Sequence, residues 1–285
     1  MANLKEIRNR IASVSSTMQI TSAMKMVSAA KLKKAQDAIT AMRPYSDKLT
    51  ELLQNLSATL DADSGSKYSE QRDLKNVLIV AITSNRGLCG AFNSNIIKQA
   101  TAVASSYGDA KVSIVAIGKK ANDALSKNFE IISNQSPVYD DLTFDNVAEI
   151  AEMLMQQFES QAVDKIELVY NKFKNAATQE IMTEQFLPIE PLKGDTNANL
   201  DYIFEPSKEE IVETLIPKSL KTQLFKAIRD SFASEHGARM TAMHKATDNA
   251  TELRDQLKLT YNKARQAAIT NEILEIVGGA EALNG

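Results

Sequence analysis

Tryptophan is absent from this chain of 285 residues, and aromatic residues make up only 6% of it. A composition with ten methionines and abundant Ala, Leu, Lys, Glu and Gln favours long helices over a compact aromatic core. The single cysteine, Cys89, excludes an internal disulfide and a zinc site made of cysteines. This cysteine usage is typical of a reducing compartment.

Long hydrophobic runs are also missing. No stretch approaches the roughly 18 consecutive apolar residues of a membrane-spanning helix. The first residues, Met-Ala-Asn-Leu-Lys-Glu, lack the apolar core of a secretion signal, and they differ from the Ser-rich, acid-poor leader of an organelle import signal. We therefore expect any membrane association to be indirect, through partner proteins.

The net charge of −3 conceals an uneven distribution. Residues 1–43 contain eight basic side chains and only two acidic ones, so this segment has a net charge of +6 and the remainder one of −9. A basic segment on an acidic protein indicates an acidic partner, which would be either a nucleic acid or an acidic protein surface.

Residues 1–60 have the apolar spacing of a coiled-coil helix. The apolar positions alternate at three and four residues: Leu4, Ile7, Ile11, Val14, Met18, then Leu32, Ala35, Ile39, Met42, Leu49, Leu53, Leu56 and Leu60. Thr21, Lys25 and Ser28 fall in the same register but are polar, so we expect the apolar face to move to the segment 23–30. Pro44 should kink the helix.

Residues 61–75 are polar and predict a linker, and residues 76–205 predict an α/β domain. Strand patterns at Val77–Thr83, Val112–Ile117, Glu130–Ser133, Lys165–Phe173 and Thr178–Leu187 alternate with helix patterns at about 91–107, 119–128 and 144–161. Such alternation is typical of a small domain with a largely parallel sheet.

Residues 207–285 predict a second long helix. Ser207 and Glu210 form a capping box, and the periodic pattern continues to Gly278 and Gly279, about 105 Å of helix. Its apolar end, Ile273–Leu283, should lie inside another protein. The predicted fold is thus an antiparallel coiled coil of the N- and C-terminal helices with an inserted small α/β (Rossmann-like) domain.

Few residues suggest chemistry. The turn Ser84–Asn93 follows a strand and begins a helix, so it could bind an anion, but it lacks the phosphate-binding glycine patterns and is better interpreted as a structural turn or a protein contact. Cys89 is expected to be a small buried residue, and His236 and His244 to lie on a polar helix surface, too far apart for a shared metal. We predict no catalytic residue, no metal site and no cofactor.

Three segments, in the right order along the chain, resemble the gamma subunit of F-type ATP synthases. They are IRNRIASVSSTMQITSAMKMVSAAKLKKA at 7–35, SNRGLCGAFN at 84–93 and the long C-terminal segment 234–283, which contains ITNEILEIVGGAEA. The resemblance implies a non-catalytic rotor shaft that couples rotation of a membrane c ring to ATP synthesis. It implies as partners three alpha and three beta subunits, the epsilon subunit and the c ring, with no nucleic acid, at the cytoplasmic face of a bacterial inner membrane.

The resemblance also assigns roles to residues. Those implied to couple rotation to catalysis are Arg8, Arg10, Met24, Lys25, Arg239, Gln266, Thr270, Glu272 and Glu275. Arg86, Gly87 and Gly90 would form a structural or subunit-contact turn of the inserted domain. Two alternatives remain: a coiled-coil adaptor whose basic segment binds nucleic acid, and an α/β enzyme with helical arms, for which no convergent polar site is visible.

Overall fold

The computed structural model describes residues 4–59, 67–189 and 208–284. The chain divides into two compact units, which we call the coiled-coil unit (residues 1–28 and 240–285) and the α/β unit (residues 29–239). Two long helices, α1 (Leu4–Thr59) and α5 (Lys208–Asn284), contribute residues to both units. The predicted capping box at Ser207 and part of the predicted linker lie outside the described residues.

The α/β unit is built around a five-stranded sheet with the order β3-β2-β1-β4-β5. The strands are β1 (Asn76–Ile82), β2 (Lys111–Ile117), β3 (Glu130–Asn134), β4 (Lys165–Phe173) and β5 (Gln179–Leu187). β1, β2, β3 and β4 are parallel, and β5 pairs antiparallel with β4. The expectation of a largely parallel sheet is therefore confirmed.

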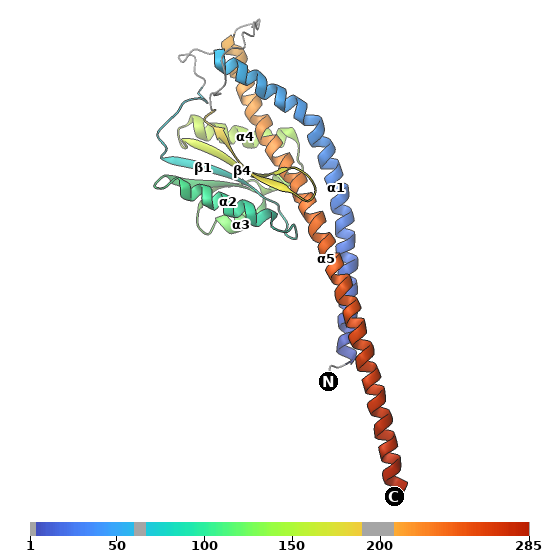
Figure 1. Cartoon of the computed structure of the whole chain (residues 1–285). Coiled ribbons are helices and arrows are strands. Elements are labelled where there is room, and N and C mark those ends of the chain that lie inside the picture. The colour runs from blue at the N-terminus through green and yellow to red at the C-terminus, as the bar shows by residue number, and fades with distance from the viewer. Residues whose placement is uncertain (1–3, 60–66, 190–207, 285) are drawn as a thin grey trace. The chain divides into compact units, whose positions relative to one another are not determined.

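Helices cover both faces of this sheet, as Figure 1 shows. α2 (Phe92–Ser106) and α3 (Lys119–Leu125) pack on one face, and α4 (Phe144–Glu159) packs with the buried side chains of α5 on the other. A short 3-10 helix, η2 (Ser136–Tyr139), follows β3.

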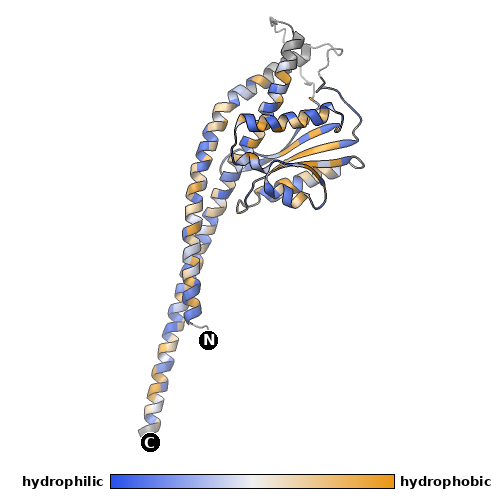
Figure 2. Cartoon of the chain, turned by 180° about the vertical axis from the view of Figure 1, so that it is seen from behind, coloured by the Kyte–Doolittle hydropathy of each residue, from blue (hydrophilic) through white to orange (hydrophobic). Residues whose placement is uncertain are grey.

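The two faces explain the continuous apolar sequence of β1. Leu78, Val80 and Ile82 enter the core formed with α4 and α5, and Val77 and Ile79 enter the core formed with α2 and α3. Because successive side chains of a strand point to opposite faces, a strand covered on both sides must be apolar throughout. In Figure 2 the strands accordingly form the most continuously hydrophobic part of the chain.

In the coiled-coil unit, the start of α1 and the end of α5 run antiparallel. Arg8 Nη2 donates to the Tyr261 hydroxyl at 2.9 Å, and Thr247 Oγ1 donates to Thr21 Oγ1 at 2.8 Å. Moving forward along α1 thus means moving back along α5, as predicted for the antiparallel coiled coil.

Two expectations need correction. Thr21 and Ser28 are buried at 9% and 3% exposure, while Met26 and Val27 are 65% and 59% exposed, so the seam keeps its register through polar residues. The hydroxyl groups of Thr21 and Ser28 are satisfied by backbone carbonyls of their own helix. The helix α3 also ends three residues earlier than expected. The helix α5 continues through Gly278 and Gly279 to Asn284, within the predicted range 207–285.

Candidate functional site

The long helix α5 is attached to the α/β unit by polar side chains that donate to backbone carbonyls. Gln223 Nε2 donates to Gln185 O at 3.3 Å, and Ser234 Oγ donates to Asn171 O at 3.0 Å. Arg239 Nη2 donates to Arg86 O and to Gly87 O, both at 3.3 Å. We call these attachments of Gln223, Ser234 and Arg239, together with Gly237, the α5 joint.

Gly237 allows α5 to approach the β4–β5 turn closely. A Cβ atom at this position would lie 3.1 Å from Ala176 O and 3.3 Å from Ala176 Cα. Because both atoms belong to backbone, they cannot move aside as the end of a flexible side chain would. The glycine at position 237 therefore has a packing reason.

The α5 joint lies at a topologically special point of the sheet. In the sheet, β2 and then β3 are added on one side of β1, and β4 is added on the other side of β1. In open α/β sheets, ligands bind at the carboxyl ends of the strands at such a switch point. Here Ser234 contacts β4 near its carboxyl end, and Arg239 contacts the turn that follows β1.

The turn that follows β1 presents its carbonyl groups to Arg239. Ser84 N donates to Asn93 Oδ1 at 2.9 Å, and Leu88 and Gly90 adopt positive φ values of 64° and 61°. An anion site would need the N–H groups of the turn to converge, whereas at Arg86 and Gly87 the carbonyls accept from a guanidinium. This geometry supports the interpretation of a structural turn.

Cys89 lies inside the same turn at 2% exposure. Burial raises the pKa of its thiol, although a hydrogen bond with Ser84 and the charge of Arg239 act in the opposite direction. A buried thiol with a raised pKa is a poor nucleophile, so the expected structural role of Cys89 agrees with its position.

Arg239 is itself buried at 8% exposure and forms an ion pair with Glu235, one helical turn earlier. Burial raises the pKa of Glu235, and Arg239 is the largest opposing influence. The resemblance implied that Arg239 couples rotation to catalysis; the structure places its side chain in the α5 joint, and its coupling role stays a prediction.

The two histidines occupy different environments. His244 is exposed and lies 3.3 Å from Asp248, as expected of a polar helix surface. His236 is only 5% exposed, packs edge-on against Phe232 and has no hydrogen-bond partner for either ring nitrogen among the described residues. The prediction of an exposed position is therefore wrong for His236, and burial lowers its pKa to about 4.

The remaining implied coupling residues lie in the coiled-coil unit. Arg10 is exposed, Met24 and Lys25 are half-buried, and Arg8 places its guanidinium 5.8 Å from the centre of the Tyr261 ring. The later ones are all exposed: Gln266, Thr270, Glu272 and Glu275. Every residue from 265 to 282 is exposed, including the apolar side chains of Ile269, Ile273, Leu274, Ile276 and Val277.

Within the described ranges, no helix combines the length and apolarity that crossing a membrane requires. The same residues contain no group of three or more His, Cys, Asp or Glu side chains able to hold a metal ion.

Comparison with known proteins gives the family. Residues 3–283 match the family model described as ATP synthase. The ATP synthase gamma chain of Flavobacterium psychrophilum is 75% identical over 286 residues, which cover 100% of both chains. The chain belongs to the ATP synthase gamma chain family.

Chains in solved structures of ATP synthases share the fold of this chain. A chain from the central stalk and c ring of Tetrahymena thermophila mitochondrial ATP synthase is 26% identical, with a TM-score of 0.60, over 80% of this chain and 99% of that one. A chain from Euglena gracilis mitochondrial ATP synthase shares the fold at 22% identity, with a TM-score of 0.67, over 98% of this chain and 94% of that one.

The sequence analysis did not identify Gln223, Ser234 and Gly237, which the structure places in the α5 joint. Small residues do recur on this part of α5, at Ser231, Ser234 and Gly237, with the spacing of one helix face. That spacing could have indicated close packing against another element.

Proposed function

We propose that this gamma-family chain is the central rotor shaft of a proton-translocating ATP synthase. In this role it couples ion-driven rotation of a membrane c ring to the conformational cycling of catalytic beta subunits, and it has no active site of its own. The observation that carries the proposal is the continuity of α5. One uninterrupted helix includes both the α5 joint and the fully exposed segment 265–282.

The exposed segment supports the idea of a surrounding sleeve. Ile269, Ile273 and Val277 are about half exposed, and Leu274 and Ile276 are more than 60% exposed, although all five are apolar. A cluster of exposed apolar side chains of this kind marks a surface that another protein covers. We assign that cover to a ring of three alpha and three beta subunits.

The proposed coupling residues would act at this sleeve. Arg8, Arg10 and Lys25 supply positive charge to α1, which suits an acidic loop of the beta subunit, and Met24 supplies a soft contact beside them. Gln266, Thr270, Glu272 and Glu275 line the exposed segment of α5. Arg239 would act from the α5 joint by keeping the helix fixed to the domain that receives torque.

We assign to the α/β unit the contact with the rotating membrane part of the complex. Its turn with Arg86, Gly87 and Gly90 would lie in the foot of the shaft, which would contact the epsilon subunit and the c ring. The chain would then be peripheral, on the cytoplasmic face of the inner membrane. In domain terms, residues 1–60 and 207–285 would form the shaft and residues 76–205 the foot.

The mechanism requires no chemistry from this chain. An asymmetric shaft inside a threefold ring contacts each beta subunit differently, so it stabilises a different conformation at each site. A ligand shifts a conformational equilibrium only by its differential affinity for the states, and the shaft would act on each beta subunit in this way. One third of a turn would advance every site to its next state.

The test is co-expression with the cognate alpha and beta subunits, followed by size exclusion and an ATPase assay with and without this chain. We expect one copy per three beta subunits and multi-site ATPase activity that depends on it. Indifferent activity or failure to enter the complex would overturn the proposal, and the adaptor hypothesis would then be tested by salt-dependent nucleic-acid binding.

A further inference from the structure

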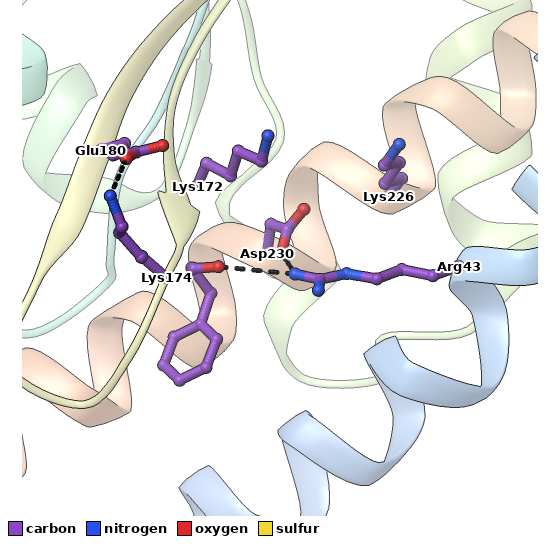
Figure 3. A pocket seen from close by; sticks show the side chains of 7 residues that line it. Arg43, Lys172, Lys174, Glu180, Lys226 and Asp230 are labelled. Atoms are coloured by element: carbon purple, nitrogen blue, oxygen red, sulfur yellow. Dashed lines mark hydrogen bonds and ion pairs between the residues drawn. The ribbon is translucent and has the colours of Figure 1, made fainter. Parts of the chain in front are cut away.

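An open pocket of about 520 Å³ lies within the α/β unit where α1, α5 and the β4–β5 hairpin meet. Figure 3 shows the side chains that line it, with Arg43 reaching from α1 toward Asp230 of α5. The lining residues are Arg43, Lys172, Phe173, Lys174, Glu180, Lys226 and Asp230. Four of the seven are cationic and two are acidic.

Arg43 joins all three elements through one guanidinium group. Its Nη2 donates to Phe173 O at the end of β4, at 3.4 Å, and lies 3.8 Å from Asp230 Oδ1 on α5. The Arg43 side chain is 45% exposed, whereas that of Asp230 is 1% exposed. The cation thus reaches inward from a half-exposed position to a buried acid and a strand carbonyl.

Asp230 is a buried acid near three cations, of which Arg43 has the largest effect on it. Neither carboxylate oxygen has a hydrogen-bond partner among the described residues, although both are buried. Burial raises the pKa of Asp230, and the nearby charge of Arg43 is the largest influence that opposes the rise, ahead of Lys226, the Phe173 backbone and Lys172. The remaining charged groups of the pocket, Lys174 and Glu180, pair with each other at 2.8 Å. A buried charge that loses its partner is strongly destabilising, so Asp230 favours the position of α1 in which Arg43 is held.

The contact also differs in kind from the α5 joint. The joint fixes α5 to backbone carbonyls of the sheet and of the turn after β1, whereas Arg43 brings in the second helix, α1. We propose that Arg43 is a latch, a positioning residue that locks α1 to α5 and β4 so that both helices carry torque from the α/β unit. The proposal rests on the proposed function and names a polar contact of α1 that takes part in it, beside the buried apolar side chains of Leu32, Ala35 and Ile39 on the same helix.

The experiment uses the assembled complex reconstituted in lipid vesicles, with ATP hydrolysis and ATP-driven proton pumping measured in parallel. We expect Arg43→Met to keep hydrolysis within about twofold of the wild-type rate and to lower the pumping per ATP hydrolysed by about threefold or more. Arg43→Lys retains the charge but loses the guanidinium geometry, so it should recover part of the pumping.

The double variant Arg43→Met/Asp230→Asn separates the latch from a role in stability alone. Removing the buried charge together with its cation should restore thermal stability toward that of the wild type, as replacement of both members of a buried pair often does. The latch is still absent, so pumping should stay low. If pumping recovers together with thermal stability, Arg43 acts on folding alone and the proposal is overturned.

Lys111→Met is the matched control. Lys111 forms an exposed ion pair with Glu130 at 2.9 Å in the same unit, away from the pocket, and its loss should leave the pumping ratio unchanged. A wild-type chain that fails to enter the complex would defeat the proposed function. If the wild type and the Arg43→Met variant pump equally many protons per ATP hydrolysed, the role proposed for Arg43 is wrong and the proposed function still stands.

Discussion

The α/β unit and the coiled-coil unit differ in how the side chains inside each of them are packed. In the α/β unit, apolar side chains fill two cores, and those of Val77–Ile82 are completely buried. In the coiled-coil unit the described buried residues form a thin seam: Ile7, Thr21, Ser28, Met243 and Ala250. The α/β unit therefore specifies its own structure, whereas the coiled-coil unit leaves much of its apolar surface for partners. Substitutions should accordingly reduce stability in the first unit and affect assembly in the second.

The largest loss of stability is expected at Gly118, in the α/β unit. This residue has a φ of 108°, and a Cβ would lie 2.3 Å from Thr83 O, so Gly118→Ala combines backbone strain with a clash against backbone. We expect it to lower the free energy of unfolding by about 4 kcal/mol. Urea unfolding followed by tyrosine fluorescence would measure the change.

Gly108→Ala is the control for Gly118. It also has a positive φ, of 58°, but nothing lies within 4 Å of the added Cβ. Gly108→Ala should lower the free energy of unfolding only by the strain of a positive φ at an alanine, about 1 kcal/mol. Equal losses at both glycines would show that the close contact with Thr83 contributes nothing.

The next largest effect is a dependence of stability on pH through His236. Its folded-state pKa of about 4 lies below the unfolded value of about 6.5, so between these values the unfolded chain binds a proton that the folded chain does not. The resulting stability is present above pH 6.5 and falls by about 3 kcal/mol as the pH decreases to 4. His236→Phe should remove this loss and keep the packing against Phe232.

The measurement compares the unfolding free energies of wild type and His236→Phe at pH 7 and pH 4.5. The difference between the proteins is needed because Asp230 and Glu235 have raised pKa values and oppose the loss in both. His244→Gln, at an exposed position, should follow the wild type. A His236→Phe variant with the wild-type acid sensitivity would contradict the assignment.

The sequence was sufficient for the elements because each carries its own periodic pattern. β4 occurs at Lys165–Phe173 as predicted, and the ends of the other strands agree within one residue. The signal is clearest in β1 and β2, whose nearly continuous apolar runs are typical of strands covered on both faces. The polar seam positions were harder to predict. Thr21 and Ser28 satisfy their hydroxyl groups within their own helix, so their burial leaves no apolar signal.

The α5 joint could not be predicted for a different reason. Ser234 and Arg239 donate to backbone carbonyls, and Gly237 packs against the backbone of Ala176. Every residue type has a backbone carbonyl, so the sequence of the partner segment carries no sign of the contact. The resemblance identified Arg239 as important, but only the structure shows what its guanidinium binds.

The smallest predicted effects compare two glycines of the same helix, one in each unit. Gly237→Ala and Gly278→Ala both gain about 1 kcal/mol of helix propensity, but Gly237 must then displace the Ala176 carbonyl, while nothing lies within 4 Å of a Cβ at Gly278. We expect Gly237→Ala to lower the unfolding free energy of the α/β unit by about 1 kcal/mol after the two contributions are combined. Gly278→Ala should instead slow hydrogen exchange of the neighbouring amides by about fivefold. If Gly237→Ala were as favourable as Gly278→Ala, the α5 joint would tolerate a wider spacing between α5 and the Ala176 backbone. The close packing of α5 in the α/β unit would then not distinguish it from the exposed part of the same helix in the coiled-coil unit.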